Sequence, residues 1–475
     1  MNIKQLRQTI LDRAIRGQLV SQDPTDEPAS VLLERIRAEK EQLIKDKKLK
    51  REKRDNQPIE EIPFEIPEGW VWCRLGEIAY IASGSTPKST SFVDKGIPYL
   101  KVYNLRNQVI DFDYKPQYIK ESIHNGILKR SKTEIGDLIM NIVGPPLGKL
   151  AIIPTSLPES NFNQAAVLIR PYLHKNIINK YLFYFLSEMS EINSISTKGS
   201  AGQVNISLSQ AKDMKIPLPP LKEQHRIVQK IEQLFALIDI IEVNKKALEK
   251  LIQQAKSQVL SDAVAGKLTH QDPNDEPAEE LLKRIGKTTA PDTPYEKMLP
   301  KGWAWCKLGD ISIINPKNKL NDELEVSFIP MSLISEGFSN AHTSEVKKWK
   351  NINKGYAHFC NEDIGIAKIT PCFENRKSVI FNNLKNGVGA GTTELYILRS
   401  NKTLSFNKYI FYFVKTQEFI NNGIKGFTGA VGQQRISRYF IENTLIPLPP
   451  IAEQHRIVQK IESYFSFFDM IENNL

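Results

Sequence analysis

One long pattern occurs twice in this chain, and the repeat constrains the fold more than any other feature. IPLPPLKEQHRIVQKIE at residues 216–232 returns as IPLPPIAEQHRIVQKIE at residues 446–462. GQLVSQDPTDEP at residues 17–28 returns as GKLTHQDPNDEP at residues 266–277. Self-similarity over a long period is the signature of a duplicated structural unit. We therefore expect two units with the same fold.

The two ends of the chain fall inside the repeated pattern. Residues 223–277 run unbroken through the middle of the protein. The first part of this stretch recurs at residues 453–475, and its last part recurs at residues 1–28. The two terminal segments together therefore repeat the central segment. This circular arrangement predicts a pseudo-twofold molecule.

The charge balance favours an anionic partner. The formal net charge is +10 and the calculated pI is about 9.1. An excess of this size favours association with nucleic acid, although it says nothing about the fold. The four cysteines form no CxxC or Cys/His cluster, so neither a zinc site nor a disulfide framework is expected. With no long apolar run, we expect a protein of the reducing cytoplasm.

Residues 221–265 are expected to form one long helix. Pro219 and Pro220 precede it, and Gly266 follows its end, which are favourable residues at those positions. Apolar residues recur along it at steps of three and four, the spacing of a coiled coil. They are Ile227, Ile231, Leu234, Ile238, Ile241, Leu248, Ile252, Ala255 and Val259, with Lys245 in the remaining position.

Such a helix needs a partner to cover its apolar face, because it extends over roughly 60 Å at 1.5 Å per residue. Apolar residues in the same phase occur at both ends of the chain. They are Ile457, Ile461, Tyr464, Phe468 and Ile471 at the C-terminus, and Ile3, Leu6 and Ile10 at the N-terminus. We expect an antiparallel pair between the central helix and a second helix assembled from both ends. A helix packed on its own domain, or a dimer, is the alternative.

Two larger segments lie between the helical parts. Each opens with GWxWCxLG, at Gly69 and Gly302, and ends near an aromatic helix, from Tyr181 and Tyr409. The predicted fold class is α+β: two mixed α/β domains in a pseudo-twofold repeat, joined by a long antiparallel helical pair. The expected boundaries are 1–28 (N-terminal part of the distal helical region), 29–65 (charged helical arm or linker), 66–220 (first α/β domain), 221–265 (central helix), 266–298 (linker), 299–450 (second α/β domain) and 451–475 (C-terminal part of the distal helix).

The catalytic motifs of common enzyme classes are missing. GPPLGKL at Gly144 lacks the first glycine of a phosphate-binding loop, and GVGAG at Gly387 is better explained as a turn before a strand. GxSxG, HExxH and the Asn/Asp-Pro-Pro-Tyr/Phe motif of amino-methyltransferases do not occur. His225 and His455 lie at equivalent places in EQHRIV, which favours a structural or subunit-contact role. We expect a non-catalytic protein without a metal site.

Candidate nucleic-acid contacts lie in loops of the two α/β domains. KVYNLRNQ from Lys101 combines basic, amide and aromatic groups, and a glycine-rich loop ends each domain. The candidates for DNA contact are Lys88, Lys101, Tyr103, Asn104, Arg106, Lys198, Gln203, Lys317, Lys319, Arg376, Thr392, Thr393, Lys425, Gln434 and Arg435. The candidates for subunit docking, taken from the repeated helix start, are Glu223, Gln224, His225, Arg226, Glu453, Gln454, His455 and Arg456.

The repeated IPLPPxxEQHRIVxKIE, together with QDPxDEP and GWxWCxLG, resembles the specificity subunit of type I restriction–modification systems. GTTELY from Gly391 is similar to an element of the recognition domains in that family, whereas the first domain has NFNQAAVLIR from Asn161 in the matching place. The resemblance implies two target-recognition domains, each reading one half of a bipartite, asymmetric DNA site. It also implies that the helical pair sets the spacing between the half-sites.

The resemblance further implies partner subunits. Two modification subunits, carrying S-adenosylmethionine, and restriction subunits, using ATP and Mg, are expected to join this chain on double-stranded DNA. The chain itself is expected to hold no cofactor. Two other classes stay open on the sequence: a coiled-coil interaction scaffold without DNA specificity, and a self-sufficient methyltransferase.

Overall fold

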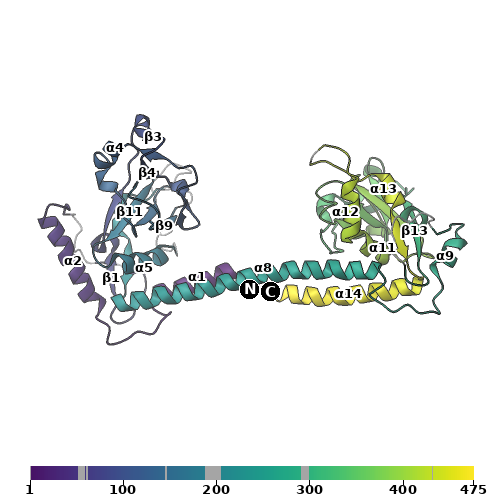
Figure 1. The fold of residues 1–475 in the computed structure, drawn as a ribbon, viewed down its shortest axis with the longest axis horizontal. Helices are drawn as coiled ribbons and strands as arrows, with labels where there is room; N and C mark the ends of the chain where they lie inside the picture. Colours follow the sequence, from purple (N-terminus) through teal and green to yellow (C-terminus); the bar gives the residue numbers. More distant parts are fainter. Residues whose placement is uncertain are drawn as a thin grey trace. The chain divides into compact units, whose positions relative to one another are not determined.

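The computed structural model describes residues 2–51, 59, 62–144, 147–187, 205–289, 299–430 and 432–475. The chain divides into two compact units, Met1–Val243 (unit 1) and Asn244–Leu475 (unit 2). Each unit contains an α/β domain and two helical segments that run alongside each other (Figure 1). Helix α8 (Leu221–Val264) begins in unit 1 and ends in unit 2.

Unit 1 contains the following elements. Besides the first part of α8, its helices are α1 (Ile3–Ile15), α2 (Ala29–Lys45), α3 (Leu75–Ile78), α4 (Glu121–Asn125), α5 (Lys175–Ser187) and α7 (Leu208–Asp213), with short 3-10 turns η1 (Ser89–Ser91), η2 (Val102–Asn104) and η3 (Lys129–Ser131). Its strands are β1 (Val71–Arg74), β2 (Ala79–Ser83), β3 (Phe92–Val93), β4 (Ile97–Leu100), β5 (Leu105–Arg106), β6 (Val109–Ile110), β7 (Tyr118–Ile119), β8 (Leu138–Asn141), β9 (Leu150–Ile152), β10 (Asn161–Phe162), β11 (Ala166–Pro171) and β12 (Lys215–Leu218).

Unit 2 repeats this plan. Besides the second part of α8, its helices are α9 (Ala278–Arg284), α10 (Leu308–Ile311), α11 (Asn407–Val414), α12 (Gln417–Lys425), α13 (Arg438–Asn443) and α14 (Ile451–Asn473), with 3-10 turns η4 (Met331–Leu333), η5 (Trp349–Asn351) and η6 (Lys385–Gly387). Its strands are β13 (Ala304–Lys307), β14 (Ser312–Ile314), β15 (Glu325–Ile329), β16 (Glu345–Lys348), β17 (Ala357–Cys360), β18 (Ile364–Ala367), β19 (Ser378–Ile380), β20 (Val388–Gly391), β21 (Leu395–Ser400) and β22 (Leu445–Leu448).

One four-stranded sheet has the same topology in both units, and the other differs: its outer strand β3 pairs with β7 in unit 1, whereas the outer strand β17 pairs with β20 in unit 2. Unit 1 has the strand orders β2-β11-β8-β9 and β10-β4-β7-β3, and unit 2 has β14-β21-β18-β19 and β16-β15-β20-β17. A small sheet in each unit pairs the opening strand with the closing one, β1 with β12 and β13 with β22. The first and last strands of each domain therefore lie side by side at the point where the next helix begins.

The larger sheet of unit 1 is buried on both faces. Because successive residues of a strand point to opposite faces, Leu138 and Met140 join the core that contains α5, and Ile139 joins the core under β4 and β10. Strand β18 of unit 2 has the same alternation, with Ile364 and Ile366 in one core and Ala367 in the other. This agrees with the predicted mixed α/β domains.

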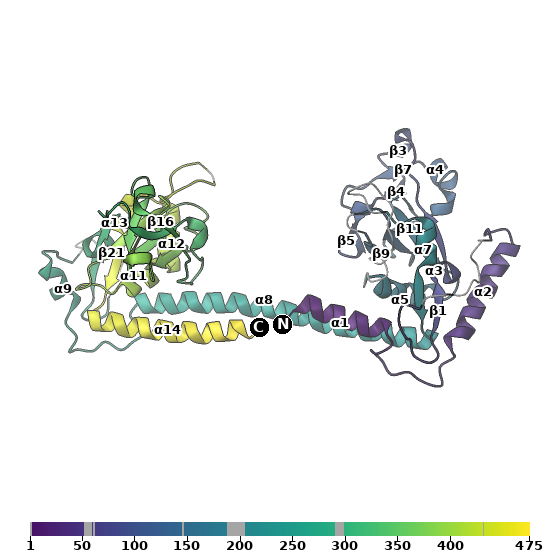
Figure 2. The same cartoon turned by 180° about the vertical axis from the view of Figure 1, so that it is seen from behind.

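Within each unit the helices pair in antiparallel fashion, as the apolar spacing predicted. In unit 1, α1 lies along the start of α8 (Figure 2). The guanidinium of Arg7 contacts the carboxylate of Asp239 there. In unit 2, α14 lies along the end of α8 (Figure 2). The ammonium of Lys256 lies 2.6 Å from the carboxylate of Asp469. Ile227, Ile231, Ile238 and Ile252 of α8 are buried.

The middle of α8 differs from the expectation of a covered apolar face. Ile241 is 42% exposed and Leu248 is 36% exposed, although both belong to the predicted coiled-coil face. Their apolar neighbours Leu237, Ile240, Val243 and Leu251 are exposed as well. The apolar face is therefore only partly covered in this stretch of α8.

Two equivalent glycines end the paired helices. Gly17 follows α1 and Gly266 follows α8, with φ of +67° and +68°. A Cβ atom would lie 2.3 Å from Cγ of Pro67 in the first case and 2.2 Å from Cγ of Pro300 in the second. The left-handed backbone and the close approach both require glycine there. Among the described residues, no helix is long and apolar enough to cross a membrane.

Candidate nucleic-acid interface and the repeated motif clusters

The three repeated motifs of unit 1 meet at the start of α8. The carboxylate of Glu223 accepts a hydrogen bond from Trp70 Nε1 at 3.0 Å and another from Gln22 Nε2 at 3.0 Å. Arg226, one turn later, donates to the carboxylate of Asp26 at 2.7 Å. EQHRIV, GWxW and QDPxDEP each supply at least one member. We call Gln22, Asp26, Trp70, Glu223 and Arg226 the motif cluster of unit 1.

Unit 2 holds a matching cluster at the start of α14. Glu453 accepts hydrogen bonds from Trp303 Nε1 at 2.9 Å and from Gln271 Nε2 at 3.1 Å. Arg456 donates to the carboxylate of Asp275. These five residues are the motif cluster of unit 2. Each cluster ties the segment after one helix to the start of its partner helix and to the opening of the α/β domain.

The electrostatics of the first cluster follow from its burial. Glu223 is 1% exposed, and loss of water raises the pKa of its carboxyl group. The hydrogen bonds from Trp70 and Gln22 act in the opposite direction, because they stabilise the charged form. The guanidinium of Arg226 has a raised pKa through its bond to Asp26. The cluster is therefore a structural network whose polar groups satisfy one another.

This geometry corrects part of the docking prediction. Glu223, Gln224, Glu453 and Gln454 are almost fully buried and make hydrogen bonds inside their own units, so they present no surface to a partner subunit. Arg226 and Arg456 are half-buried and paired with aspartates. His225 and His455 are exposed, and the ring of His455 lies 4.1 Å from that of Phe406.

The other members of the clusters were not predicted to be partners of these glutamates. In the sequence, Gln22, Trp70 and Asp26 and their counterparts in unit 2 are recognisable only as members of repeated motifs. The useful signal was that all three motifs recur together, which is expected when the residues contact one another.

In unit 1, a group of cations and aromatic rings gathers around the loop after β4. The Arg106 guanidinium lies 4.1 Å from the ring centre of Tyr114, and the Lys115 ammonium lies 5.4 Å from the same ring. The Lys101 ammonium lies 5.9 Å from the ring centre of Tyr103. Tyr103 and Tyr114 pack edge to face at 6.1 Å. Cations beside aromatic rings suit contacts with nucleic acid, and Arg106 and Lys115 are exposed.

Asn104 differs from the expectation of a DNA contact. It is 1% exposed, and its Nδ2 donates to the carbonyl groups of Asp111 and Tyr114 at 3.0 and 2.9 Å. Its Oδ1 accepts a hydrogen bond from the Lys101 backbone at 2.9 Å. The amide is fully used inside the domain, so Asn104 positions the loop and does not face a ligand.

In unit 2, the element GTTE holds the loop before α13. Both carboxylate oxygens of Glu394 accept from the Arg435 guanidinium, at 2.9 and 3.0 Å, and this pairing lowers the pKa of Glu394. Thr392 accepts a hydrogen bond from the Glu394 backbone, and Thr393 is exposed. Arg435 is thus already paired with a carboxylate. In unit 1, Ala165 takes the place of Glu394, which follows from the matching parallel pairs β4–β10 and β15–β20.

Arg376 belongs to a buried cationic site. Its Nε donates to the carbonyl of Lys415 at 3.0 Å, and its guanidinium lies 5.0 Å from the ring centre of Phe338. Lys415 is fully buried and donates to the carbonyls of Gly337 and Arg376 at 2.7 and 2.9 Å. Burial, with a contribution from the charge of Arg376, lowers the pKa of Lys415 to about 7. This arrangement ties loops together and leaves Arg376 half-buried.

The remaining candidates lie at the surface or outside the described residues. Lys88, Lys317, Lys319 and Lys425 are exposed, and Gln434 is half-buried. Lys198 and Gln203 lie outside the described residues, as does most of the glycine-rich loop of the first domain. The structure therefore supports surface cations in both domains without bringing all fifteen candidates to one place.

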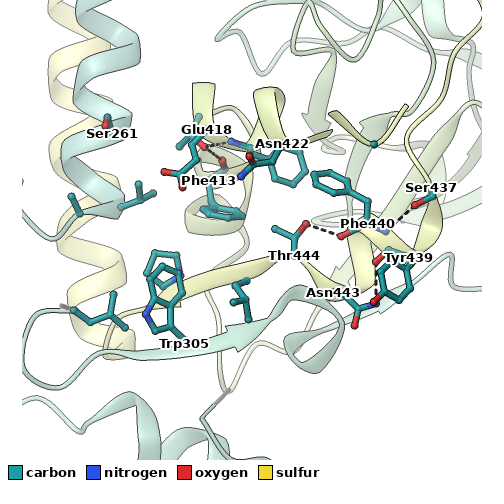
Figure 3. Close-up of a pocket in the computed structure, with 18 of the residues that line it drawn as sticks. Ser261, Trp305, Phe413, Glu418, Asn422, Ser437, Tyr439, Phe440, Asn443 and Thr444 are labelled. Carbon is teal, nitrogen blue, oxygen red and sulfur yellow. Dashed lines mark hydrogen bonds between the residues drawn. The ribbon is translucent and has the colours of Figure 1, made fainter. Parts of the chain in front are cut away.

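Unit 2 also contains an apolar pocket of about 710 Å³ between the end of α8, α12 and α13 (Figure 3). Trp305, Phe413, Phe419 and Phe440 line it. The polar groups that Figure 3 shows between α13 and β22 bond one another, as Asn443 Nδ2 does with the Tyr439 carbonyl at 3.0 Å. The charged residues of the lining are Lys267 and Glu418.

Side chains of the types that often act in catalysis have structural roles here. Among the described residues, no group of three or more His, Cys, Asp or Glu side chains is arranged to hold a metal ion. Cys73 and Cys306 are buried at equivalent positions, and burial raises the pKa of both thiols, which makes them unreactive. The buried hydroxyl groups of Tyr181 and Tyr409 donate to the carbonyls of Pro217 and Pro447, each at 2.6 Å.

Comparisons with known proteins agree with the resemblance that the motifs suggested. A family model described as the type I restriction modification DNA specificity domain matches residues 67–250 and again residues 300–475. The EcoAI specificity subunit of Escherichia coli is 46% identical over 241 residues, which cover 46% of this chain and 41% of that protein. The EcoEI specificity subunit is 44% identical over the same length, covering 40% of that protein. These two alignments thus span about two fifths of each relative.

More distant relatives match over greater lengths. The EcoKI specificity subunit of Escherichia coli (strain K12) is 24% identical over 427 residues, covering 86% of this chain and 85% of that protein. The HsdS subunit from Thermoanaerobacter tengcongensis has a TM-score of 0.53 at 19% identity, covering 88% of this chain and 94% of that chain. A chain from a type I restriction–modification system gives a TM-score of 0.58 at 18% identity, covering 87% and 94%. These two solved structures share the fold, which confirms the predicted fold class.

Proposed function

Because the chain belongs to the type I restriction modification DNA specificity domain family, we propose that it is the non-catalytic specificity subunit of a type I restriction–modification complex. Each unit carries one recognition domain, and each domain reads one half of a bipartite, asymmetric DNA target. The duplicated match to the family model, at residues 67–250 and 300–475, is the observation that carries this proposal. Two copies of a DNA specificity domain in one chain fit two half-sites better than one.

The chemistry of the surface supports DNA as the ligand. The chain has a net charge of +10, and the exposed Arg106 and Lys115 lie beside the ring of Tyr114 in unit 1. Lys101, Arg106 and Lys115 are suited to phosphate contacts, which position a protein on the duplex, while amide side chains read base edges.

Partner subunits supply the reaction in this proposal. Two modification subunits bring S-adenosylmethionine and the adenine-methylating site, and restriction subunits bring ATP, Mg and DNA cleavage. The exposed apolar side chains in the middle of α8, among them Leu237, Ile240 and Leu251, are the surface we assign to helices of the modification subunits. His225 and His455 are exposed at the helix starts and suit the same partners.

The experiment is to map methylated adenines in the DNA of cells with and without this chain, in a host that lacks other adenine methyltransferases. The proposal expects a two-part motif that is methylated only when this chain and its modification subunits are both present. The purified chain alone should transfer no methyl group. It should bind duplex DNA with an affinity that falls steeply with salt. A motif that persists without the chain contradicts the proposal.

A further inference from the structure

The β5–β6 hairpin of unit 1 presents side chains that the fold does not use. Arg106 of β5 pairs with Val109 of β6, so Asn107 and Gln108 form a two-residue turn. Residues 106–109 are all exposed. Within the part of the chain that the structure describes, neither the Asn107 nor the Gln108 side chain has a hydrogen-bond partner. Figure 2 labels β5 at a lateral edge of this domain.

The backbone of the turn is well suited to Asn107 and poorly suited to Gln108. Their φ angles are +49° and +62°. A two-residue hairpin turn of this kind requires positive φ at both positions, and asparagine followed by glycine is the favoured pair. Asparagine tolerates this conformation, whereas a longer side chain adopts it rarely. Turn chemistry therefore explains Asn107 but not Gln108, which points to a role for the Gln108 side chain itself.

The base of the hairpin is held rigidly. Asp111 donates its backbone N–H to the Asn104 carbonyl at 2.8 Å, and the buried Asn104 amide donates to Asp111 and Tyr114. Leu105 is 3% exposed and anchors β5 in the core. The exposed tip therefore projects in a fixed direction, which lowers the entropy cost of binding.

Positive charge surrounds the hairpin. Arg106 leaves the strand next to the turn and stacks on Tyr114, and Lys101 and Lys115 lie over Tyr103 and Tyr114. The carboxylate of Asp111 is 3.7 Å from Arg106 and balances part of this charge. A rigid two-stranded ribbon with an amide at its tip and cations at its base matches the major groove of DNA, which admits such a ribbon between two rows of phosphates.

We propose that the β5–β6 hairpin enters the major groove and that the Gln108 amide reads an adenine in the half-site bound by unit 1. This inference rests on the proposed function. A glutamine amide has one acceptor and one donor that match the N6 and N7 atoms of adenine in the major groove. Lys101, Arg106 and Lys115 contact the flanking phosphates, which fixes the register of the hairpin.

The test uses the chain together with its modification subunits. Once methylation mapping has given the motif, duplexes with single A·T pairs replaced in either half compete with the intact site for binding. Gln108→Gly should lose discrimination at one A·T pair by about tenfold or more, because a bidentate amide–adenine contact supplies discrimination of that size. Discrimination at the other pairs should stay as in the wild type. Since glycine suits the turn, the thermal unfolding midpoint should not fall.

Asn107→Gly is the matched control, since the turn explains that residue without a ligand. It should keep the discrimination of the wild type. Unchanged discrimination in Gln108→Gly overturns the inference, as does an equal loss of affinity for all duplexes or the same selective loss in Asn107→Gly. If the wild-type complex shows no preference among duplexes at all, the proposed function fails, and that outcome is distinct from a failure of the hairpin assignment.

Discussion

The motif clusters of units 1 and 2 are alike, whereas the recognition loops of the two units differ. Trp70 and Trp303 donate to Glu223 and Glu453 at 3.0 and 2.9 Å, and Gln22 and Gln271 donate to the same glutamates at 3.0 and 3.1 Å. By contrast, Leu105 pairs with Ile110 to form the short hairpin of unit 1, whereas in unit 2 a longer loop, residues 335–342, follows Ile334, which bridges to His342. The repeated residues join distant segments of each unit through buried hydrogen bonds, and the differing residues lie at the surface.

The two loops also differ in how they are held. In unit 2, the Gly337 carbonyl accepts from Lys415, Asn340 accepts from the Ile380 backbone, and His342 accepts from the Asn382 backbone. The tip of the hairpin in unit 1 has no such ties among the described residues. A buried, mutually satisfied network loses stability with any change, whereas an exposed loop tolerates replacement. Two domains that recognise different DNA sequences can therefore share the same buried clusters.

The largest expected effect comes from breaking a motif cluster. Glu223→Ala and Glu453→Ala each remove the acceptor of a buried indole N–H and of an amide. We expect each to destabilise its own unit by about 3 kcal/mol, the cost of leaving buried donors unpaired. Cys73 and Cys306 are buried at equivalent places, so labelling of their thiols during urea unfolding reports the two units separately.

His225→Ala is the control for this pair of variants, because His225 is exposed and should change stability by less than about 0.5 kcal/mol. Equal effects in the two units sharpen the likeness of the clusters. A Glu223→Ala variant as stable as His225→Ala contradicts it.

A smaller effect is expected in the pH dependence of stability, which should differ between the two units. The pKa of Lys415 is lowered from 10.5 to about 7 by burial. Between these values the unfolded state holds a proton that the folded state has released, so the stability of unit 2 should rise with pH, by as much as about 1.4 kcal/mol per pH unit. Below pH 7 this contribution to the slope disappears. Unit 1 has Ser187 at the position that matches Lys415, so its stability should lack this pH-dependent contribution.

Urea midpoints of Cys306 labelling between pH 7 and pH 10 measure this slope. Lys415→Met removes the titrating amine, so it should flatten the slope. A slope that survives in Lys415→Met shows that another group titrates.

The smallest effect is expected at the ion pair that only unit 2 has. Glu394→Ala copies the residue of unit 1, Ala165, and frees Arg435. Both side chains are partly exposed, at 28% and 40%, and such pairs contribute little to stability. The unfolding midpoint of unit 2 should therefore not change measurably by Cys306 labelling, with wild type as the reference. A clear drop indicates that the pair, and not the strand pairing, holds this loop.

The repeat predicted much of this structure. The aromatic helices expected from Tyr181 and Tyr409 lie in α5 (Lys175–Ser187) and α11 (Asn407–Val414). The expected helix from 221 to 265 is α8, one residue shorter. These elements are encoded by local apolar spacing and by helix-ending residues, which act over a few neighbours.

The role of the repeated glutamates could not be predicted in the same way. Glu223 and Trp70 are 153 positions apart, and only folding brings them together. Their repetition was therefore misread as a docking surface. Asn104 shows the same difficulty. An amide in a basic loop is typical of a DNA contact, and only the structure shows that this amide is buried and donates to two carbonyl groups. The Lys415 site depends on packing from three distant segments.

The most direct test of the central claim, that each unit reads its own half of the target, is a domain exchange followed by methylation mapping. Residues 66–215 are replaced by the matching segment of a relative with a different target that retains the tryptophan equivalent to Trp70. The account predicts a new motif in which one half is that of the donor and the other half is unchanged. A change in both halves, or in neither, contradicts it.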